Sequence, residues 1–418
     1  MGATAFLGGG SAFAADLGGN CCADLEERIA ELEATTARKG NRKVSLTITG
    51  WVSSQIYWFD DTIESNAYIV DNNNDLSSNV KFTGSAQIAP GWKAGYSLWI
   101  YTTLASSLTA NETNASIKGN GVSIENSYWF VQSDQLGKLS VGKQSLAADN
   151  AALGTDFSGT LFPANSVTFD GTTLNLVEKG TGVYTNTRWI TAAFWCEHAG
   201  VGIANDCAGG RLNGIRYDTP TIAGFTFSAS WGEDDYWDVA GRYAGEFSGF
   251  KVSLAAAYSE STDENILGVG IQKQNDNQYF QVGGMIKHLA SGLWVHGTYG
   301  LNFIDNGPNF TDNHPDIEGI YIKAGISQKY FGLGQTHLYG EYGRNDDAFA
   351  HGTAFSFGTV TGSEATRWGV GVVQEIDAAA MSLWAKWRHH EYEATNAAGA
   401  NLQFENNDMF LAGAVIFY

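Results

Sequence analysis

The sequence contains no hydrophobic run long enough to form a membrane helix. Such a helix needs about 20 consecutive apolar residues, and every apolar stretch here is shorter. Proline is scarce, with 5 residues among 418, and the 24 basic residues are outnumbered by 44 acidic ones. The resulting net charge of −20 argues against nucleic acid as a partner, because nucleic acid attracts basic surfaces.

Recognisable catalytic and metal-binding motifs are also missing. The chain has no Gly-x-Ser-x-Gly, Walker or His-Glu-x-x-His motif, and its 4 cysteines do not have the spacing of metal ligands. His389 and His390 fall on an expected strand, where neighbouring side chains point to opposite faces and do not share a metal. We therefore expect no enzyme, no cofactor and no metal. The alternative, a surface hydrolase, would have to use His314 or His351, and neither has an evident partner.

Glycine and aromatic residues, by contrast, are abundant. The chain has 51 glycines and 13% aromatic residues, a composition that suits strands better than helices. From residue 43 onward apolar and polar residues alternate, as in Val44, Leu46 and Ile48 against Ser45 and Thr47. About sixteen segments of this kind begin near residues 43, 76, 92, 122, 137, 211, 224, 236, 249, 275, 293, 319, 335, 365, 380 and 405.

The connections between these segments alternate in length. Short turns such as Pro90-Gly91 and Ser248-Gly249 alternate with long stretches, which include residues 60–75, 105–121, 147–210, 304–318, 346–364 and 395–404. Short turns at one end and long loops at the other are typical of a barrel seated in a membrane. We therefore predict an all-β fold, a 16-stranded antiparallel transmembrane β-barrel over residues 43–418. A soluble sandwich is the alternative, but its loops would not sort by length in this way.

The last strand supports the membrane interpretation. Phe410, Ala412, Ala414, Ile416 and Tyr418 share one face, and the chain ends on an aromatic residue. We expect this face to meet lipid, with Tyr418 at the interfacial aromatic belt and the last strand paired with the first.

The N-terminal region reads as an export signal followed by a helix. Residues 1–14 end in an Ala-x-Ala site and are predicted to be a residual signal peptide, or alternatively a flexible leader. Residues 15–42 are predicted to be a periplasmic coiled coil and hinge. Cys22, Leu25, Ile29 and Leu32 have the spacing of a coiled-coil seam, although a single amphipathic helix would show the same pattern.

Two of the cysteines bracket a decapeptide that resembles a loop. Cys196 and Cys207 should form a disulfide in an oxidising compartment, and two free thiols are the alternative. The adjacent Cys21 and Cys22 do not readily bond to each other, but they could bridge chains.

Several segments resemble the trimeric general porins of alphaproteobacteria, in particular a rhizobial-type family. These are "DLEERIAELEATTARKGNRKVSLTITGW", "NGIRYDTPTIAGFTFSASWG", "SGTLFPANSVTFDG" and the aromatic-ended last strand, although Tyr418 stands where Phe is more usual. The resemblance implies a homotrimer of sixteen-stranded barrels in the outer membrane of a Gram-negative bacterium. It also implies contact with lipid and lipopolysaccharide, and passage of small hydrophilic solutes. The alternatives are a tether to peptidoglycan through the coil and a substrate-specific channel.

The longest connection, residues 147–210, is the expected constriction. In porin-like barrels the third loop folds inward, and this one carries Asp149, Asp156 and Asp170; an ordinary surface loop is the alternative.

Strand alternation predicts that a set of bases faces the lumen: Lys81, Lys93, Arg216, Arg242, Lys251, Lys287, Lys323, Lys386 and Arg388. Fewer inward acids are expected, namely Asp218, Asp238, Glu341 and Glu375. Wall bases that face loop acids would create a field across the pore that orients dipolar solutes. The small surplus of inward bases over acids predicts a slight anion preference, and Arg216 and Arg388 are the best candidates for the narrow part. Any single base could instead be a solvated or interfacial charge.

Overall fold

The computed structural model describes residues 43–72, 76–103, 105–114, 121–167, 170–196, 206–207, 211–232, 235–262, 277–304, 314–350 and 355–418. The predicted signal peptide and the predicted coiled coil, with Cys22, Leu25, Ile29 and Leu32, lie outside these residues and stay predictions. Within the described part of the chain, no helix is both long and apolar enough to cross a bilayer.

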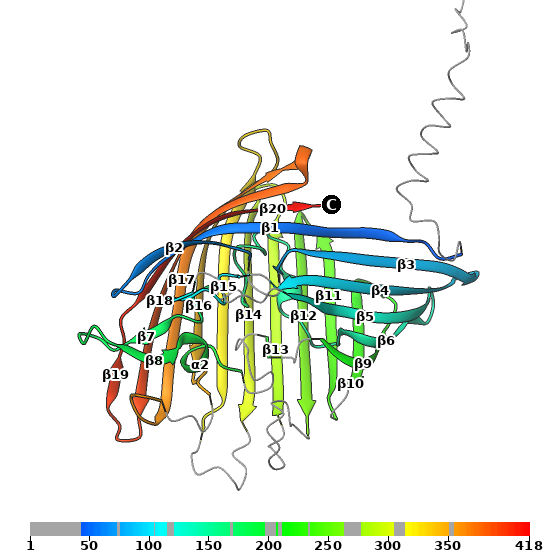
Figure 1. Ribbon diagram of the computed structural model, residues 1–418. Helices are drawn as coiled ribbons and strands as arrows, with labels where there is room; N and C mark the ends of the chain where they lie inside the picture. Colours follow the sequence, from blue (N-terminus) through cyan, green and yellow to red (C-terminus); the bar gives the residue numbers. More distant parts are fainter. Residues whose placement is uncertain are drawn as a thin grey trace, which may run out of the picture.

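The fold is a closed antiparallel barrel. An 18-stranded sheet consists of a ring of sixteen strands and two short strands, β2 (Ser65–Val70) and β19 (Asn401–Gln403), that extend it locally. The ring is formed by β1 (Thr47–Asp60), β3 (Asn79–Ala89), β4 (Trp92–Thr103), β5 (Gly121–Ser133), β6 (Gly137–Ser145), β9 (Arg211–Asp218), β10 (Phe225–Gly232), β11 (Trp237–Phe247), β12 (Phe250–Ser261), β13 (Asn277–His288), β14 (Leu293–Ile304), β15 (Ile317–Gln328), β16 (Thr336–Asp346), β17 (Val360–Ile376), β18 (Met381–Asn396) and β20 (Asn407–Phe417). In Figure 1, β3 to β6 run across the view and β12 to β16 run down it, as opposite walls of a barrel with tilted strands do.

The predicted strands match the observed ring. The largest differences in starting position are at β1, which begins at Thr47 instead of 43, and at β17, which begins at Val360 instead of 365. At β17 the pairing with β18 continues past a register shift between Val360 and Gly362. A register shift interrupts the two-residue alternation, so the alternation did not predict the first residues of this strand.

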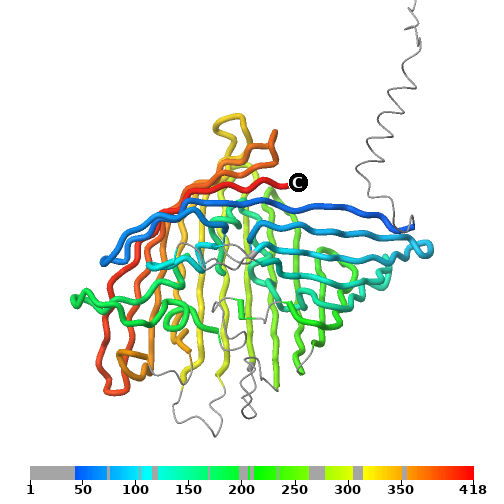
Figure 2. The backbone as a smooth tube through the Cα atoms, in the orientation of Figure 1, coloured from blue at the N-terminus to red at the C-terminus, as the bar shows by residue number. Residues whose placement is uncertain are grey.

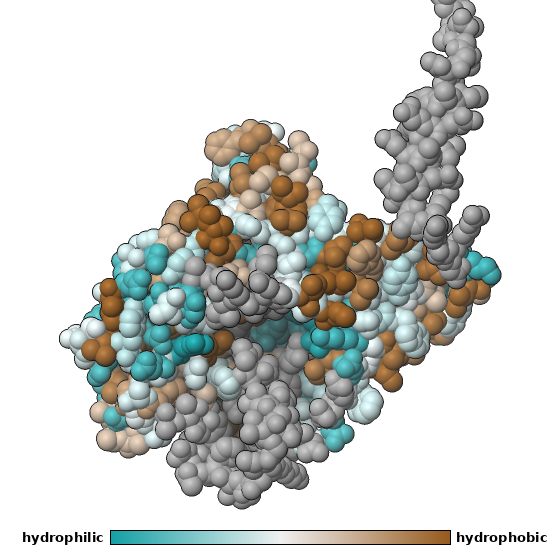
Figure 3. Space-filling view, viewed as in Figure 1, coloured by the Kyte–Doolittle hydropathy of each residue, from teal (hydrophilic) through white to brown (hydrophobic). Residues whose placement is uncertain are grey.

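The two faces of each wall differ as the alternation predicts. On β1, Ser53, Gln55 and Tyr57 are buried, whereas Val52 and Ile56 are 59% and 52% exposed. Exposed aliphatic and aromatic side chains recur on the other strands, and Figure 3 shows brown patches of hydrophobic residues on the visible outer wall. The apolar face is therefore the outer one, and the polar side chains point inward.

The last strand closes the ring as predicted. β20 pairs with both β1 and β18, and Figure 2 shows the red C-terminal segment running beside the blue first strand. The Tyr418 backbone N–H donates to the Gly50 carbonyl at 3.1 Å. Phe410 and Ile416 are exposed on the outer face, whereas Met409 and Leu411 are buried.

The connection between β6 and β9, here called the third loop, carries structure of its own. It contains a short 3-10 turn η2 (Leu153–Thr155), the hairpin of β7 (Asn175–Val177) and β8 (Tyr184–Arg188), and one helical turn, α2 (Trp189–Ala192). Its second half packs in a large apolar cluster, in which Leu174, Leu176, Trp189 and Phe194 join Tyr392, Met409 and Leu411 of β18 and β20.

Candidate functional site

The first half of the third loop follows the inner wall strand by strand. Its backbone N–H groups donate to inward side chains of β10, β11 and β13: Ala147 to Ser230 at 2.6 Å, Ala148 to Asp238 at 2.7 Å, and Ala152 to Gln281 at 2.8 Å. The loop backbone would otherwise bury unpaired donors, so these wall side chains make its course along the wall possible. The structure thus places this segment inside the barrel.

Further along, ion pairs fix the loop to the wall. Lys323 on β15 donates to Asp156 at 2.5 Å and to the Ala164 carbonyl at 2.6 Å. Asp170 accepts from Lys386 at 2.6 Å and from Arg388 at 2.5 Å, both on β18. Arg388 also binds Glu341 at 2.6 Å, and all of these charged side chains are fully buried. A buried charge is tolerated only when it is paired, so each pair acts as a fixed attachment of the loop.

The two loop carboxylates remain ionised because of these contacts. Burial is the largest single influence on the pKa of Asp156 and by itself would raise it. The attraction and hydrogen bond of Lys323, together with His296 and Ser158, outweigh burial and hold that pKa below its usual range. For Asp170 the same opposition holds. The pKa of its carboxyl is lowered strongly, because Lys386 and Arg388 together exceed the effect of burial.

Over residues 150–167, the loop surface that stays accessible carries no charge, since Asp156 is the one charged residue there and its side chain is fully buried. Leu153, Phe157 and Leu161 are half-buried and Gly154 is exposed, while the acid side chains beside them point to the wall. The predicted field between wall bases and loop acids is therefore not arranged as expected. The physical reason is that the wall bases reach the carboxylates directly and neutralise them at contact distance.

Close packing also holds the tip of the loop. Gly159 has a φ of +85°, and a Cβ there would lie 2.4 Å from the His337 ring on β16, so no larger residue fits. Phe162 packs against Trp51 of β1 and Phe417 of β20, with ring centroids 5.5 Å apart in both cases. The tip therefore contacts the inner wall from β16 to β1.

Strands β3 to β6 form the wall opposite the loop, here called the bare wall. Lys81 lies over the Trp99 ring, with its Nζ 4.8 Å from the centroid. Lys138 lies over Phe130 at 4.9 Å and over Tyr128 at 5.2 Å. These bases contact aromatic rings of their own wall instead of the loop, and both lie on inward positions of their strands.

The other predicted bases fall in two groups. Arg216 and Arg242 hold the root of the loop: Arg216 donates to the Ser145 carbonyl at 3.0 Å and Arg242 to the Ala147 carbonyl at 2.6 Å. The rest lie on inward positions of their strands toward the short-turn end of the barrel, namely Lys93, Lys251 and Lys287. Lys251 lies over the loop ring Phe157 at 4.8 Å. Asp149, at the loop root, hydrogen-bonds Ser145 and lies 3.8 Å from Arg211. Whether any of these residues lines the narrow part stays a prediction.

Sequence reasoning missed two basic residues of this site. Arg367 is buried on β17, stacks on Tyr321 at 4.9 Å and donates to the loop carbonyl of Asn165 at 3.3 Å. Its nearest neighbours on the same strand face are Ala365, Gly369, Gly371 and Val373, so the alternation did not mark that part of the face as polar. Lys138 is absent from the predicted set of inward bases, although Lys138 and Ser140 alternate with Leu139 and Val141 and indicate its inward position.

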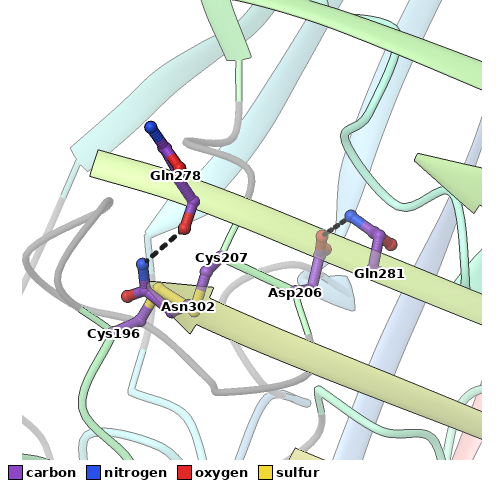
Figure 4. The surroundings of a disulfide bond; sticks show 6 residues. All are labelled: Cys196, Asp206, Cys207, Gln278, Gln281 and Asn302. Carbon is purple, nitrogen blue, oxygen red and sulfur yellow. Dashed lines mark hydrogen bonds between the residues drawn. A yellow bond between two sulfur atoms is a disulfide. The ribbon is translucent and has the colours of Figure 1, made fainter. Parts of the chain in front are cut away.

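The predicted disulfide is present. Cys196 and Cys207 are bonded (Figure 4) and buried. They pack against Tyr279 of β13 and the loop alanines. Next to the bond, Gln281 donates to the Ala148 carbonyl at 2.9 Å and to Asp206 at 3.4 Å (Figure 4). The bridge therefore links two residues of the distal third loop, and it packs against β13, the strand whose Gln281 also holds the loop root.

The adjacent histidines point to opposite faces as predicted. His389 contacts Asp408 at 2.9 Å on the outer face, and His390 is buried inside against Trp189 and Phe194. Among the described residues, no group of three or more His, Cys, Asp or Glu side chains has an arrangement that could hold a metal.

Comparisons with known proteins agree with this geometry. A family model described as Gram-negative porin matches residues 3–376, whereas no curated protein sequence matches the chain. Among solved structures, the chain is similar to OmpT of Vibrio cholerae (15% identity, TM-score 0.52, 91% of this chain and 99% of that one). It is also similar to the outer-membrane channel DcaP of Acinetobacter baumannii (10%, 0.52, 91% and 99%) and to OmpF of Salmonella typhi in complex with daunomycin (14%, 0.52, 90% and 98%). These likenesses show the barrel fold, and the family model covers most of the sequence. The chain therefore belongs to the Gram-negative porin family and is an outer-membrane channel for small hydrophilic solutes.

Proposed function

We propose that this porin passes small solutes with a weak preference for anions. The observation that carries the proposal is the pairing of the loop acids. Asp156 forms a buried ion pair with Lys323, and Asp170 forms buried ion pairs with Lys386 and Arg388. The aperture then lies between an uncharged loop surface and a bare wall that carries Lys81 and Lys138. Charges farther away, including most of the acids that make the chain acidic, are screened beyond about 8 Å at physiological salt.

A reversal potential tests this proposal directly. The purified protein is placed in a planar bilayer with potassium chloride at different concentrations on the two sides. We expect ion conductance, with a reversal potential of the sign that marks chloride as the more permeant ion. A cation-selective channel would contradict the anion preference, and a silent barrel would contradict the channel itself.

We further propose that three chains assemble as a homotrimer of the rhizobial type. The sequence resemblance supports this proposal, and so does a related fold, since one solved structure of Vibrio cholerae OmpT is described as a trimer form. Native mass spectrometry in mild detergent should show a mass of three chains. A spectrum with monomers alone would contradict the proposal.

A further inference from the structure

A small polar cavity lies beneath the root of the third loop, on the side of the periplasmic turns. It has a volume of about 150 Å³ and is lined by Asn126, Tyr128, Lys138, Gln144, Ser145, Arg216 and Asp218. Since one water occupies about 30 Å³ of liquid, the cavity has room for roughly five waters or a solute of similar size. Its lining comes from the neighbouring strands β5, β6 and β9, so it lies where the bare wall meets the covered one.

One lining side chain is buried without a hydrogen-bond partner. Asn126 is 7% exposed, and its Oδ1 has no donor. A buried acceptor without a donor costs free energy, so the position is explained best if a ligand supplies the donor. The register of β5 is shifted at this point: Trp99 pairs with Asn126 but Ile100 pairs with Ile124, which leaves Glu125 as an extra residue. Such bulges redirect side chains next to functional sites.

Among the charged groups of the cavity, the Lys138 ammonium and one oxygen of Asp218 can still bind a ligand. The Lys138 ammonium lies over Tyr128 and Phe130 and has no hydrogen-bond acceptor among the described residues. Arg216 is already committed to Asp218 and to the Ser145 and Leu146 carbonyls. Asp218 receives Arg216 at 2.8 Å and Ser228 at 2.6 Å, both on Oδ1, so its Oδ2 can still accept.

This combination selects a particular ligand chemistry. The ammonium of Lys138 can bind an anionic group, whereas Asn126 Oδ1 and Asp218 Oδ2 can accept hydrogen bonds from donors of the ligand. A plain carboxylate would leave both acceptors unpaired, and a plain polyol would leave the ammonium unpaired. We propose that the cavity is a binding site for small hydroxylated carboxylates, whose carboxylate meets Lys138 and whose hydroxyls meet Asn126 and Asp218. This inference rests on the proposed channel function and specifies one class of its solutes.

The test on the unaltered protein compares three probes in a planar bilayer. Chloride conductance is recorded while glycerate, propionate or glycerol is added. We expect glycerate to reduce the conductance in a saturable way, with propionate and glycerol at least roughly tenfold weaker, since each lacks one half of the match. Equal effects of glycerate and propionate, or no saturation with glycerate in a channel that conducts chloride, would overturn the site. A barrel that conducts no ions would instead overturn the channel function.

Variants then assign the effect to the cavity. Lys138→Gln should raise the half-saturating concentration of glycerate roughly ten- to a hundredfold, the usual effect of losing a hydrogen bond to a charged group. Asn126→Ala should raise that concentration roughly three- to tenfold. It should leave the effect of propionate unchanged, because propionate has no hydroxyl for Asn126. Lys138→Arg should retain most of the effect. Lys329→Gln is the matched control, since it removes one lysine charge from an exposed periplasmic turn. Unchanged half-saturation in Lys138→Gln, in a channel of normal conductance, would overturn the assignment.

Discussion

The covered wall, β9 to β18, and the bare wall, β3 to β6, carry the same kinds of residue but use them differently. On the covered wall, Lys323, Lys386 and Arg388 are fully buried in ion pairs with the third loop. On the bare wall, Lys81 and Lys138 lie over aromatic rings and face the lumen. We infer from this difference that an inward base in a barrel either holds a loop in place or contributes charge to the passage.

The covered wall should be the more sensitive to substitution. Asp170→Asn removes the carboxylate that pairs with both Lys386 and Arg388 and leaves two buried cations with fewer partners. Breaking a buried pair from one side costs about 3–5 kcal/mol, so we expect the loop to detach and the single-channel conductance to rise. Urea unfolding of the protein in liposomes and single-channel recording measure both effects.

Asp377→Asn is the matched control for this variant. Asp377 lies in a periplasmic turn, where it is 62% exposed and 3.8 Å from Lys329. Exposed pairs contribute about 0–1 kcal/mol, so stability and conductance should be nearly unchanged. Equal behaviour of the two variants would mean that the ion pairs do not hold the loop.

The disulfide gives the second largest expected effect on the covered side. Closing a loop of about 12 residues contributes roughly 3 kcal/mol in the chain-entropy model. Replacing Cys196 and Cys207 together with Ser should therefore lower the stability of the third loop while the barrel persists, as measured by hydrogen exchange of residues 147–196. Peptide mapping without reduction is the check on the native protein, and two alkylatable thiols in freshly isolated outer membranes would contradict the bridge.

The barrel could be predicted from the sequence because strand alternation is a local signal. Each turn and each outward face, such as that of Phe410 and Ile416, follows from neighbouring residues, and so does the pairing of the last strand with the first. The positions of the bases on the inner face followed in the same way, as Lys323 and Lys386 illustrate.

The partners of those bases could not be predicted, because they depend on the course of a long loop. Asp156 lies 167 residues from Lys323, and Asp170 lies 216 from Lys386, so nothing local indicates that they meet. For the same reason Arg367 escaped notice, since its role becomes visible only when the loop backbone lies beside it. Sequence patterns thus predict which residues form the wall, whereas the partners of the charged wall residues depend on the course of the third loop.

Ion selectivity should separate the two walls with a smaller effect. Lys81→Gln removes a charge that faces the lumen, so the reversal potential should move toward cations. We expect a change of roughly twofold in the permeability ratio, because one charge a few ångströms away contributes at most about 1 kcal/mol in water. Lys386→Gln removes a buried charge, so it should alter loop stability and conductance more than selectivity. A larger selectivity change in Lys386→Gln than in Lys81→Gln would contradict the division of tasks.

The smallest expected effect is a difference in pH response between two loop contacts. The pKa of Asp170 is lowered, so its stabilising contribution is present above the unfolded pKa of about 4 and is lost only as the pH falls further. Burial instead raises the pKa of Glu112, which accepts from the Asn175 backbone N–H at 2.5 Å. A raised carboxyl pKa means that the folded state binds the proton more tightly than the unfolded state. Acidification toward that pKa should therefore stabilise the folded loop around Glu112, because it removes the cost of burying the carboxylate. Between pH 7 and pH 5, hydrogen exchange corrected for its intrinsic rate should slow around residues 112 and 175 and stay constant around residues 156–167. Glu112→Gln should abolish the pH response at its own contact alone. If residues 156–167 lost protection by pH 5, the carboxylates that hold the third loop would be titrating far above the range that their buried pairing implies.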